Sequence, residues 1–449
     1  MNSSGSGYAR WFSHGAFSLI NRIAILGFGF INVMFMVRIV PKAEIGIWVL
    51  FTSVTSILEM MRAGFIRNPF ITTLVSAAEK DRRSVITTSL ALHFIVATSI
   101  SAVLVILAIP LATFWKASGL DALFFIYALH NILLIPYLHF EYLQTTKLQF
   151  KAIFICNVVR MGILAIYIFV CFVIHKNVTL VELAIVQTIG TVVGTITGYP
   201  YVRDLLKLVP FVDKKLLSKL FHFGKYTFGT NISSMFMRST DSWLIGRVIS
   251  TSAVASYNPA IRLANLFEVP TLAIANFIFP QVAKKMKDHG KAGVRDIYVK
   301  SVSLMLALAL PMIVPLYCFA EFFIEIIFGS EYLEAAPILR ITAFYSIIIP
   351  FNRQFGMVLD GLGKPKLNFQ LLVMTALLNV VLSYFLLGKF GLIGCAYGAL
   401  LSYCILFTIN QVILYRVFGI RVLKVFAHIL VWYRTGWNLA FAKAIQVVR

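Results

Sequence analysis

The stretch VITTSLALHFIVATSISAVLVILAIPLAT, residues 85–113, decides the fold class because it contains no Asp, Glu, Lys or Arg. A transmembrane α-helix needs about 20 consecutive, mainly apolar residues, so this stretch alone can cross a bilayer. The whole chain of 449 residues has a similar character, being 59% hydrophobic and 13% charged with a mean hydropathy of +0.86. Such a composition leaves too little polar surface to cover a water-soluble globule. The sequence therefore predicts an all-α polytopic membrane protein.

Apolar stretches of spanning length recur along the chain, separated by short polar or basic segments. We expect about twelve transmembrane helices from their number. They cover residues 15–38, 45–66, 85–113, 121–145, 152–174, 180–202, 226–249, 254–281, 297–327, 337–360, 367–387 and 392–417.

The net charge of +22, from 40 Lys and Arg against 18 Asp and Glu, is distributed unevenly over the connections. Basic residues concentrate in alternate connections, such as the junction at 203–225. The others hold little beyond Lys42, Lys116, Lys176 and Lys389. By the positive-inside rule, both termini are expected in the cytoplasm and the number of spans is even. This placement accounts for the charge without nucleic acid, which is not an expected partner.

Three landmarks of the first half recur in the same order in the second half, which indicates an internal duplication. Residues 38–48 align with 247–257, Pro69 with Pro280, and 135–137 with 349–351. Two parallel six-helix bundles follow from this repeat. The expected domains are an N-terminal bundle at 1–202, a cytoplasmic amphipathic linker at 203–225, a C-terminal bundle at 226–418 and a basic amphipathic cytoplasmic tail at 419–449.

Ionisable residues inside the predicted spans gather on the helices that the duplication makes equivalent. A charge at the centre of a bilayer costs about 2.5–3.5 kcal/mol on insertion scales, so it usually faces a partner or an aqueous cavity. Glu59 and Arg62, and likewise Arg238 and Asp241, are spaced i, i+3 and share one helix face. Each pair therefore fits a mutual ion pair as well as a functional role.

Arg22, Arg262 and Arg353 have no acidic residue three or four positions away on the same helix. A guanidinium facing a cavity offers a planar fork of donors that suits phosphate oxygens. Pairing with another helix is the alternative interpretation. The candidate substrate-binding residues are Arg22, Arg160, Arg238, Arg262 and Arg353, and the ion-coupling candidates are Asp241, Glu59 and Glu268. The coupling ion, Na⁺ or H⁺, stays open.

Catalytic motifs do not occur in the sequence. It contains no GxxxxGK[ST], HExxH or GxSxG pattern, so we expect no enzyme activity, no catalytic residues, no metal and no cofactor. His130 and His139 lie on opposite faces of one helix. We therefore interpret these histidines, together with His93, as packing or interfacial residues rather than as a proton relay.

Several segments of the second half carry a family resemblance. Residues 241–246, 254–262, the Phe279-Pro280 pair and 328–340 together resemble the polysaccharide transporter branch of the MOP flippase superfamily. The resemblance extends over most of 224–403, and Asp241 and Arg262 fall on its pattern. It implies two six-helix bundles around a central cationic cavity that works by alternating access.

The resemblance also implies a substrate and a location. Members of this branch move isoprenoid-diphosphate-linked oligosaccharides, namely repeat units of O antigen, capsule or exopolysaccharide, across the bacterial inner membrane. The implied partners are the lipid-linked oligosaccharide, membrane lipids and, as an open alternative, polysaccharide assembly proteins.

Two other functions compete with this interpretation. A cation-coupled multidrug exporter of the same superfamily would use carboxylates in its cavity, and the excess of arginine argues against it. A membrane polysaccharide polymerase or ligase would need a sizeable periplasmic loop with catalytic groups, whereas every predicted periplasmic loop is short.

Overall fold

A computed structural model describes the backbone of residues 4–206 and 208–448. Side chains are described except at residues 4–16, 18–19, 223–238, 268–270, 272–273, 276–277, 279–280 and 436–448. The described backbone is helical almost throughout and includes no strand. The predicted all-α fold class is confirmed.

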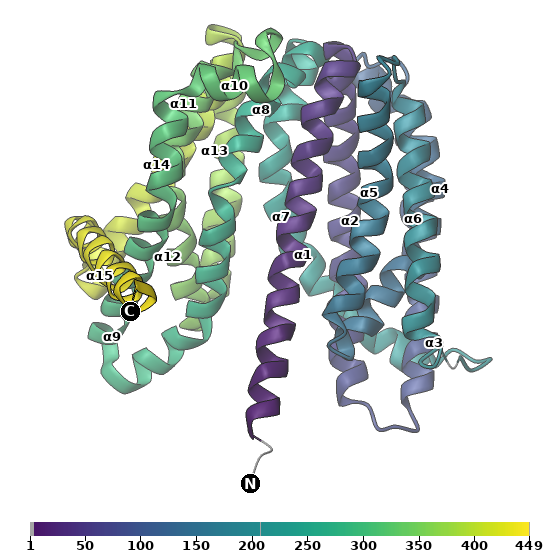
Figure 1. The fold of residues 1–449 in the computed structure, drawn as a ribbon, viewed down its shortest axis with the longest axis horizontal. Coiled ribbons are helices and arrows are strands. Elements are labelled where there is room, and N and C mark those ends of the chain that lie inside the picture. Colours follow the sequence, from purple (N-terminus) through teal and green to yellow (C-terminus); the bar gives the residue numbers. More distant parts are fainter. Residues whose placement is uncertain (1–3, 207, 449) are drawn as a thin grey trace. The chain divides into compact units, whose positions relative to one another are not determined.

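Packing divides the chain into two units, Met1–Ala255 and Ser256–Arg449. The helices of the first unit run side by side (Figure 1). They are α1 (Ser4–Ile39), α2 (Lys42–Ser76), α3 (Arg82–Phe114), α4 (Leu120–Thr146), α5 (Phe150–Val173), α6 (Leu180–Val202) and α7 (Lys214–Val248). The boundary between the units lies inside α8 (Thr251–Asn265).

The remaining elements belong to the second unit. They are α9 (Glu268–Cys318), α10 (Ala320–Phe328), the 3₁₀ helix η1 (Ser330–Tyr332), α11 (Ala335–Ser346), α12 (Ile349–Gly361), α13 (Pro365–Phe390), α14 (Leu392–Phe418) and α15 (Val422–Val448). Within α9, Gly290 has φ 57° and ψ −146°, so α9 consists of two helices joined at a kink. A positive φ of this kind costs glycine little, because it has no Cβ.

Ten helical segments in the described part of the chain are long and apolar enough to cross a membrane. They correspond to the predicted spans other than 226–249 and 254–281. These two spans include many of the residues whose side chains the structure does not describe. A multi-pass membrane protein is therefore established, whereas the number twelve remains a prediction.

Helix α7 packs with the first unit, although the duplication predicts that it opens the second. Its Trp243 donates a hydrogen bond through Nε1 to Ser53 Oγ of α2 at 2.8 Å, and the Trp243 carbonyl accepts one from Trp115 Nε1 at 3.1 Å. The domain boundaries predicted from the repeat thus remain a prediction, while the packing boundary lies inside α8.

The predicted linker at 203–225 is partly helical, because α7 begins at Lys214. Asp213 caps this helix by accepting hydrogen bonds from the backbone N–H groups of Lys215 and Leu216 at 2.9 and 3.1 Å. Leu220 is buried against α2 and α3, whereas Lys219 is exposed. The alternation of Leu and Lys therefore separates a face that packs on the bundle from a charged face.

Glycine permits α2 to approach the start of α8 very closely. A Cβ added to Gly46 would lie 1.8 Å from the carbonyl oxygen of Thr251, far inside van der Waals contact. A Cβ at Gly246 would lie 3.2 Å from side-chain atoms of Leu50 and Trp115. The chain therefore turns from α7 into α8 directly against α2.

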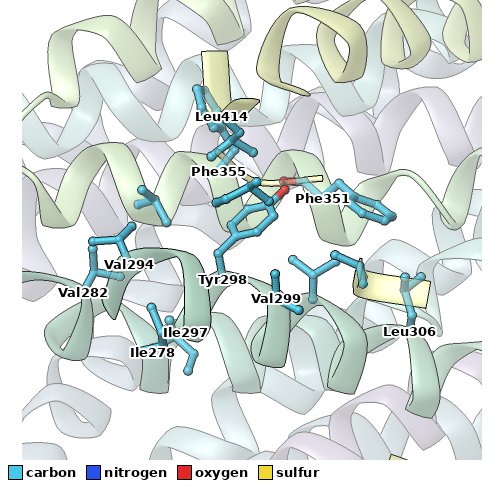
Figure 2. Close-up of a cluster of buried hydrophobic side chains, with 14 of the residues drawn as sticks. Ile278, Val282, Val294, Ile297, Tyr298, Val299, Leu306, Phe351, Phe355 and Leu414 are labelled. Carbon is cyan, nitrogen blue, oxygen red and sulfur yellow. Dashed lines mark hydrogen bonds between the residues drawn. The ribbon is translucent and has the colours of Figure 1, made fainter. Parts of the chain in front are cut away.

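The apolar core of the second unit is formed by α9, α12, α14 and α15, as Figure 2 shows around Tyr298. Phe351, Phe355 and Leu414 pack there with Tyr298, which is completely buried. The Tyr298 hydroxyl donates a hydrogen bond to the Phe351 carbonyl oxygen at 3.3 Å. This bond satisfies a polar group that would otherwise be costly to bury.

Candidate functional site

A buried polar network connects three helices of the first unit, with Arg62 of α2 at its centre. Arg62 has no exposed surface, and its Nη1 donates to Asn131 of α4 twice, to the carbonyl oxygen at 3.0 Å and to Oδ1 at 2.7 Å. Asn131 Nδ2 in turn donates to the Ala97 carbonyl and to Ser101 Oγ of α3, both at 2.9 Å. A charge-assisted bond of this kind is stronger than a neutral one.

Glu59 lies one turn before Arg62 but has a different partner. The Tyr127 hydroxyl of α4 donates to Glu59 Oε1 at 3.3 Å. The salt bridges among the described residues do not include Glu59 with Arg62. Of the two interpretations of this i, i+3 pair, the mutual ion pair is therefore not the arrangement adopted.

Three histidines of the first unit, His93, His130 and His139, are buried next to this network. His93 and His139 have no exposed surface, and their ring centroids lie 6.4 Å apart. His130 stacks on Tyr127 at 5.6 Å and places Nδ1 3.0 Å from Thr188 Oγ of α6. The rings fill space between helices, as their interpretation as packing residues requires.

Arg160 of α5 occupies a second polar position in the same unit. Its guanidinium lies 4.9 Å from the ring centroid of Tyr137, a cation–π geometry. The Tyr137 hydroxyl donates to Asn157 Oδ1 at 2.8 Å. A Cβ added to Gly190 of α6 would lie 2.5 Å from the Arg160 carbonyl oxygen. The close approach of α6 therefore holds Arg160, which is only partly buried, at a defined position.

The other candidates on α1, α7 and α9 are described less completely. Arg22 is exposed on α1, and Asp241 is partly buried on α7. The side chains of Arg238 and Glu268 lie outside the described residues. Their predicted roles stay predictions.

Two candidate arginines of the second unit are partly exposed on α8 and α12. Arg262 donates through Nε to Asn258 Oδ1 at 2.5 Å, one turn earlier on α8. Arg353 follows Asn352, whose Nδ2 donates to the Tyr403 carbonyl at 3.3 Å and whose Oδ1 accepts from Asn410 Nδ2 at 2.9 Å. Helix α8 ends three residues after Arg262, where Leu266 and Phe267 form a turn before α9.

The structure thus places Glu59, which is bonded to Tyr127, and Arg160, which packs on Tyr137, at two polar positions of the first unit. It places Arg262 and Arg353 on separate helices of the second. Sequence reasoning missed Asn131 and Tyr127, which organise the polar contacts of the first unit. Their signal was weak because single uncharged polar residues are common in apolar spans. In the described part of the chain, no group of three His, Cys, Asp or Glu side chains could hold a metal ion.

The fold resembles two solved transporter structures. An inward-facing multidrug resistance MATE family transporter of the MOP superfamily superposes with a TM-score of 0.73 at 14% identity, covering 87% of this chain and 93% of the other. The lipid II flippase MurJ in an inward closed conformation superposes with a TM-score of 0.72 at 13% identity, covering 93% of this chain and 90% of the other. At these identities the likeness establishes the fold alone.

Sequence comparison identifies the family. A protein of Haloferax volcanii described as a probable low-salt glycan biosynthesis flippase is 27% identical over 216 residues, which are 48% of this chain and 45% of that relative. The chain thus aligns with less than half the length of this relative. The family model "Polysaccharide biosynthesis protein" matches residues 35–337, well over half of the chain. The chain therefore belongs to the polysaccharide biosynthesis protein family.

Proposed function

We propose that this protein is a flippase that moves an isoprenoid-diphosphate-linked oligosaccharide across the bacterial inner membrane by alternating access. The substrate would be a repeat unit of O antigen, capsule or exopolysaccharide. Family membership supports the proposal, as do the sequence similarity to a probable glycan biosynthesis flippase and the fold shared with a lipid II flippase. A multi-pass orientation with both termini in the cytoplasm is part of it.

The observation that carries the proposal is the set of arginines held within apolar helices. Arg160, Arg262 and Arg353 are all partly exposed rather than sealed in a core. An intramembrane ionisable residue that reaches an accessible surface is a functional candidate by default. A guanidinium fork suits the two phosphates of the carrier better than it suits a cationic drug.

Arg62 differs from these partly exposed arginines because its side chain is completely buried. Because Arg62 is completely buried and bonded to Asn131, we assign it a structural role. Arg22 is exposed on α1 and stays in the proposed substrate-binding set with Arg238. The central cationic cavity implied by the resemblance is also part of the proposal.

Ion coupling is the least constrained part. Glu59 is partly buried and accepts a hydrogen bond from Tyr127, so protonation or Na⁺ binding there would alter an interaction between α2 and α4. Asp241 and Glu268 are the other candidates, and the choice between Na⁺ and H⁺ is open. Polysaccharide assembly proteins are proposed as further partners.

A transport assay tests the proposal. Purified protein in liposomes is supplied with a fluorescent isoprenoid-diphosphate-linked oligosaccharide, and its movement between leaflets is measured by quenching. We expect Arg262→Ala and Arg353→Ala to slow transport at least tenfold and Arg262→Lys to be intermediate. Arg340→Ala is the matched control, because Arg340 is engaged by Glu321 at 2.5 Å on the surface. Unchanged transport by both alanine variants at normal expression would remove the support for a cationic mechanism.

A multidrug exporter is the second candidate, since the MATE transporter has nearly the same fold similarity as the flippase. It would export a cationic dye from the same liposomes and leave the lipid-linked oligosaccharide in place. A polymerase or ligase would instead change the mass of the glycan. Mass spectrometry of the recovered substrate distinguishes that outcome.

A further inference from the structure

Helix α15 has one face that packs on the second unit. Val425 and Ile429 are buried there, with 0% and 5% of their surface exposed. Trp432 Nε1 donates to Ser303 Oγ of α9 at 2.9 Å, and the Tyr433 hydroxyl donates to the Ala307 carbonyl at 2.9 Å. In Figure 1, α15 lies oblique to the long axes of α13 and α14. It is therefore docked across the unit rather than aligned with its neighbours.

A second face of α15 is apolar and largely exposed. Leu423 and Leu430 are 80% and 71% exposed, and Phe426 is 44% exposed. Their spacing of i, i+3 and i+7 places them on one side of the helix. Such a stripe is unfavourable in water and favourable among acyl chains.

Exposed basic residues border the apolar stripe of α15, because Lys424 follows Leu423 and Arg434 lies one turn beyond Leu430 on the same side of the helix. Lys424 and Arg434 are exposed, as is Arg421 just before the helix. Residues 419–449 contain five Lys and Arg and no Asp or Glu. The segment therefore carries positive charge without any acidic residue of its own to neutralise it.

The docking point on α9 lies near the polar end of a membrane span. Lys300 and Asp296 form an exposed ion pair at 3.0 Å, and Ala307 lies about 10 Å further along the helix at 1.5 Å per residue. Ser303 and Ala307 thus belong to the first apolar turns beyond the charged segment. A helix docked there lies at the depth where headgroups meet acyl chains.

We propose that α15 binds the anionic phospholipid surface of the membrane and, when bound, braces α9 against α12. The apolar stripe enters the acyl region, and Lys424 and Arg434 meet phosphate headgroups. We infer that α15 holds α9 against α12 because its Val425 and Ile429 pack in one apolar cluster with Tyr298 of α9 and Phe351 of α12. The ring of Phe426 also lies 6.1 Å from that of Phe351. This inference does not depend on the transported substrate.

Hydrogen exchange on the full-length protein in nanodiscs tests the proposal. We compare nanodiscs of phosphatidylcholine alone with an equal mixture of phosphatidylcholine and phosphatidylglycerol. In the anionic nanodiscs we expect slower exchange in α15 and in the facing segments around Tyr298 and Phe351. Lys424→Gln with Arg434→Gln should remove most of the gain in protection that anionic lipid gives. Each basic residue is expected to account for about fivefold of that protection, and exchange in phosphatidylcholine should stay unchanged.

Two further variants separate the lipid effect from loss of fold. Lys364→Gln with Lys366→Gln makes the same charge change at exposed positions at the start of α13 and should keep the full gain in protection. Trp432→Phe, which removes the bond to Ser303, should speed exchange in both lipids and preserve their ratio. The proposal is overturned if wild type shows no difference between the lipids. It is equally overturned if the Lys424 and Arg434 variant gains as much protection as wild type. Crosslinking between two copies through Leu430→Cys would identify a second copy as the occupant instead, and would also overturn it.

Discussion

The polar interiors of the two units are built from different chemistry. In the first unit, a permanently charged group, Arg62, connects α2 through Asn131 to α3 and α4. In the second unit, hydrogen bonds between neutral groups connect the helices. Asn410 donates to Asn352 at 2.9 Å, and Gln411 Nε2 donates to the Tyr298 hydroxyl at 3.3 Å. One network therefore centres on a guanidinium that stays charged at any accessible pH, whereas the bonds made by Asn410 and Gln411 join neutral groups.

This difference predicts unequal tolerance to loss of a partner. A buried charge left unpaired costs several kcal/mol, whereas a neutral amide left unpaired costs about 1–3 kcal/mol. Arg62 already has Nε and Nη2 atoms that donate to no atom of the described residues. Its bonds to Asn131 are thus the main compensation for burying it, and the first unit should be the more fragile of the two.

The largest effect is expected for Asn131→Leu, which removes the Oδ1 acceptor of the buried Arg62 guanidinium and leaves it only the backbone carbonyl of residue 131. We expect a loss of about 3 kcal/mol or more in unfolding free energy, because an acceptor lost from a buried charged donor costs more than the about 1–3 kcal/mol of a neutral group. Thermal unfolding in detergent, followed by tryptophan fluorescence, measures it. The double variant Arg62→Met with Asn131→Leu should recover much of the loss. A double variant less stable than Asn131→Leu would show that the buried charge of Arg62 does not cause the loss.

Next in size is Gly46→Ala, which inserts a Cβ 1.8 Å from the Thr251 carbonyl oxygen. Relief of this clash requires the start of α8 to move away from α2, at about 1–3 kcal/mol, a cost typical of overpacking. Maleimide labelling of Ser53→Cys should become faster as this contact opens. Gly27→Ala is the matched control, because no atom lies within 4 Å of its added Cβ. Equal labelling in the two variants would contradict the prediction.

A smaller effect is expected for Asn410→Ala in the second unit. The substitution removes the donor to Asn352 Oδ1, and we expect a loss of about 1–2 kcal/mol from an unpaired neutral group. The same unfolding measurement applies. The loss of unfolding free energy for Asn410→Ala is compared with that for Asn131→Leu. Equal losses would mean that the buried charge of Arg62 does not distinguish the two interiors.

The smallest effect is expected at the exposed pair of Lys176, in the connection between α5 and α6, and Glu182, in the first turn of α6, whose charged atoms lie 3.3 Å apart. The hydrogen bond to Glu182 raises the pKa of Lys176. Any stabilisation is therefore complete below the unfolded pKa of lysine and disappears as pH rises through the higher folded value. Lys176→Gln should leave the unfolding midpoint at neutral pH unchanged within error, because exposed pairs contribute little. A clear shift at neutral pH would contradict this.

Some features of the candidate site could be predicted from the sequence, and others could not. That Arg262 and Arg353 have no acidic residue at i±3 or i±4 was readable from the sequence, because this spacing is a local property. The partners of Arg62 and Glu59 were not readable. Asn131 and Tyr127 are 69 and 68 residues away from them in the chain, and nothing in the spacing of α2 indicates which face of α4 will meet it.

The helix positions and the family were determined by the sequence itself, since a lipid environment requires long apolar segments with internally satisfied backbones. Composition and short motifs encode this locally. The tertiary structure alone decided that α7 packs with the first unit, that Arg62 bonds to Asn131 instead of Glu59, and that α15 docks on α9. These outcomes depend on which side chains fit together across distant segments, and packing complementarity of that kind leaves no periodic trace in the chain.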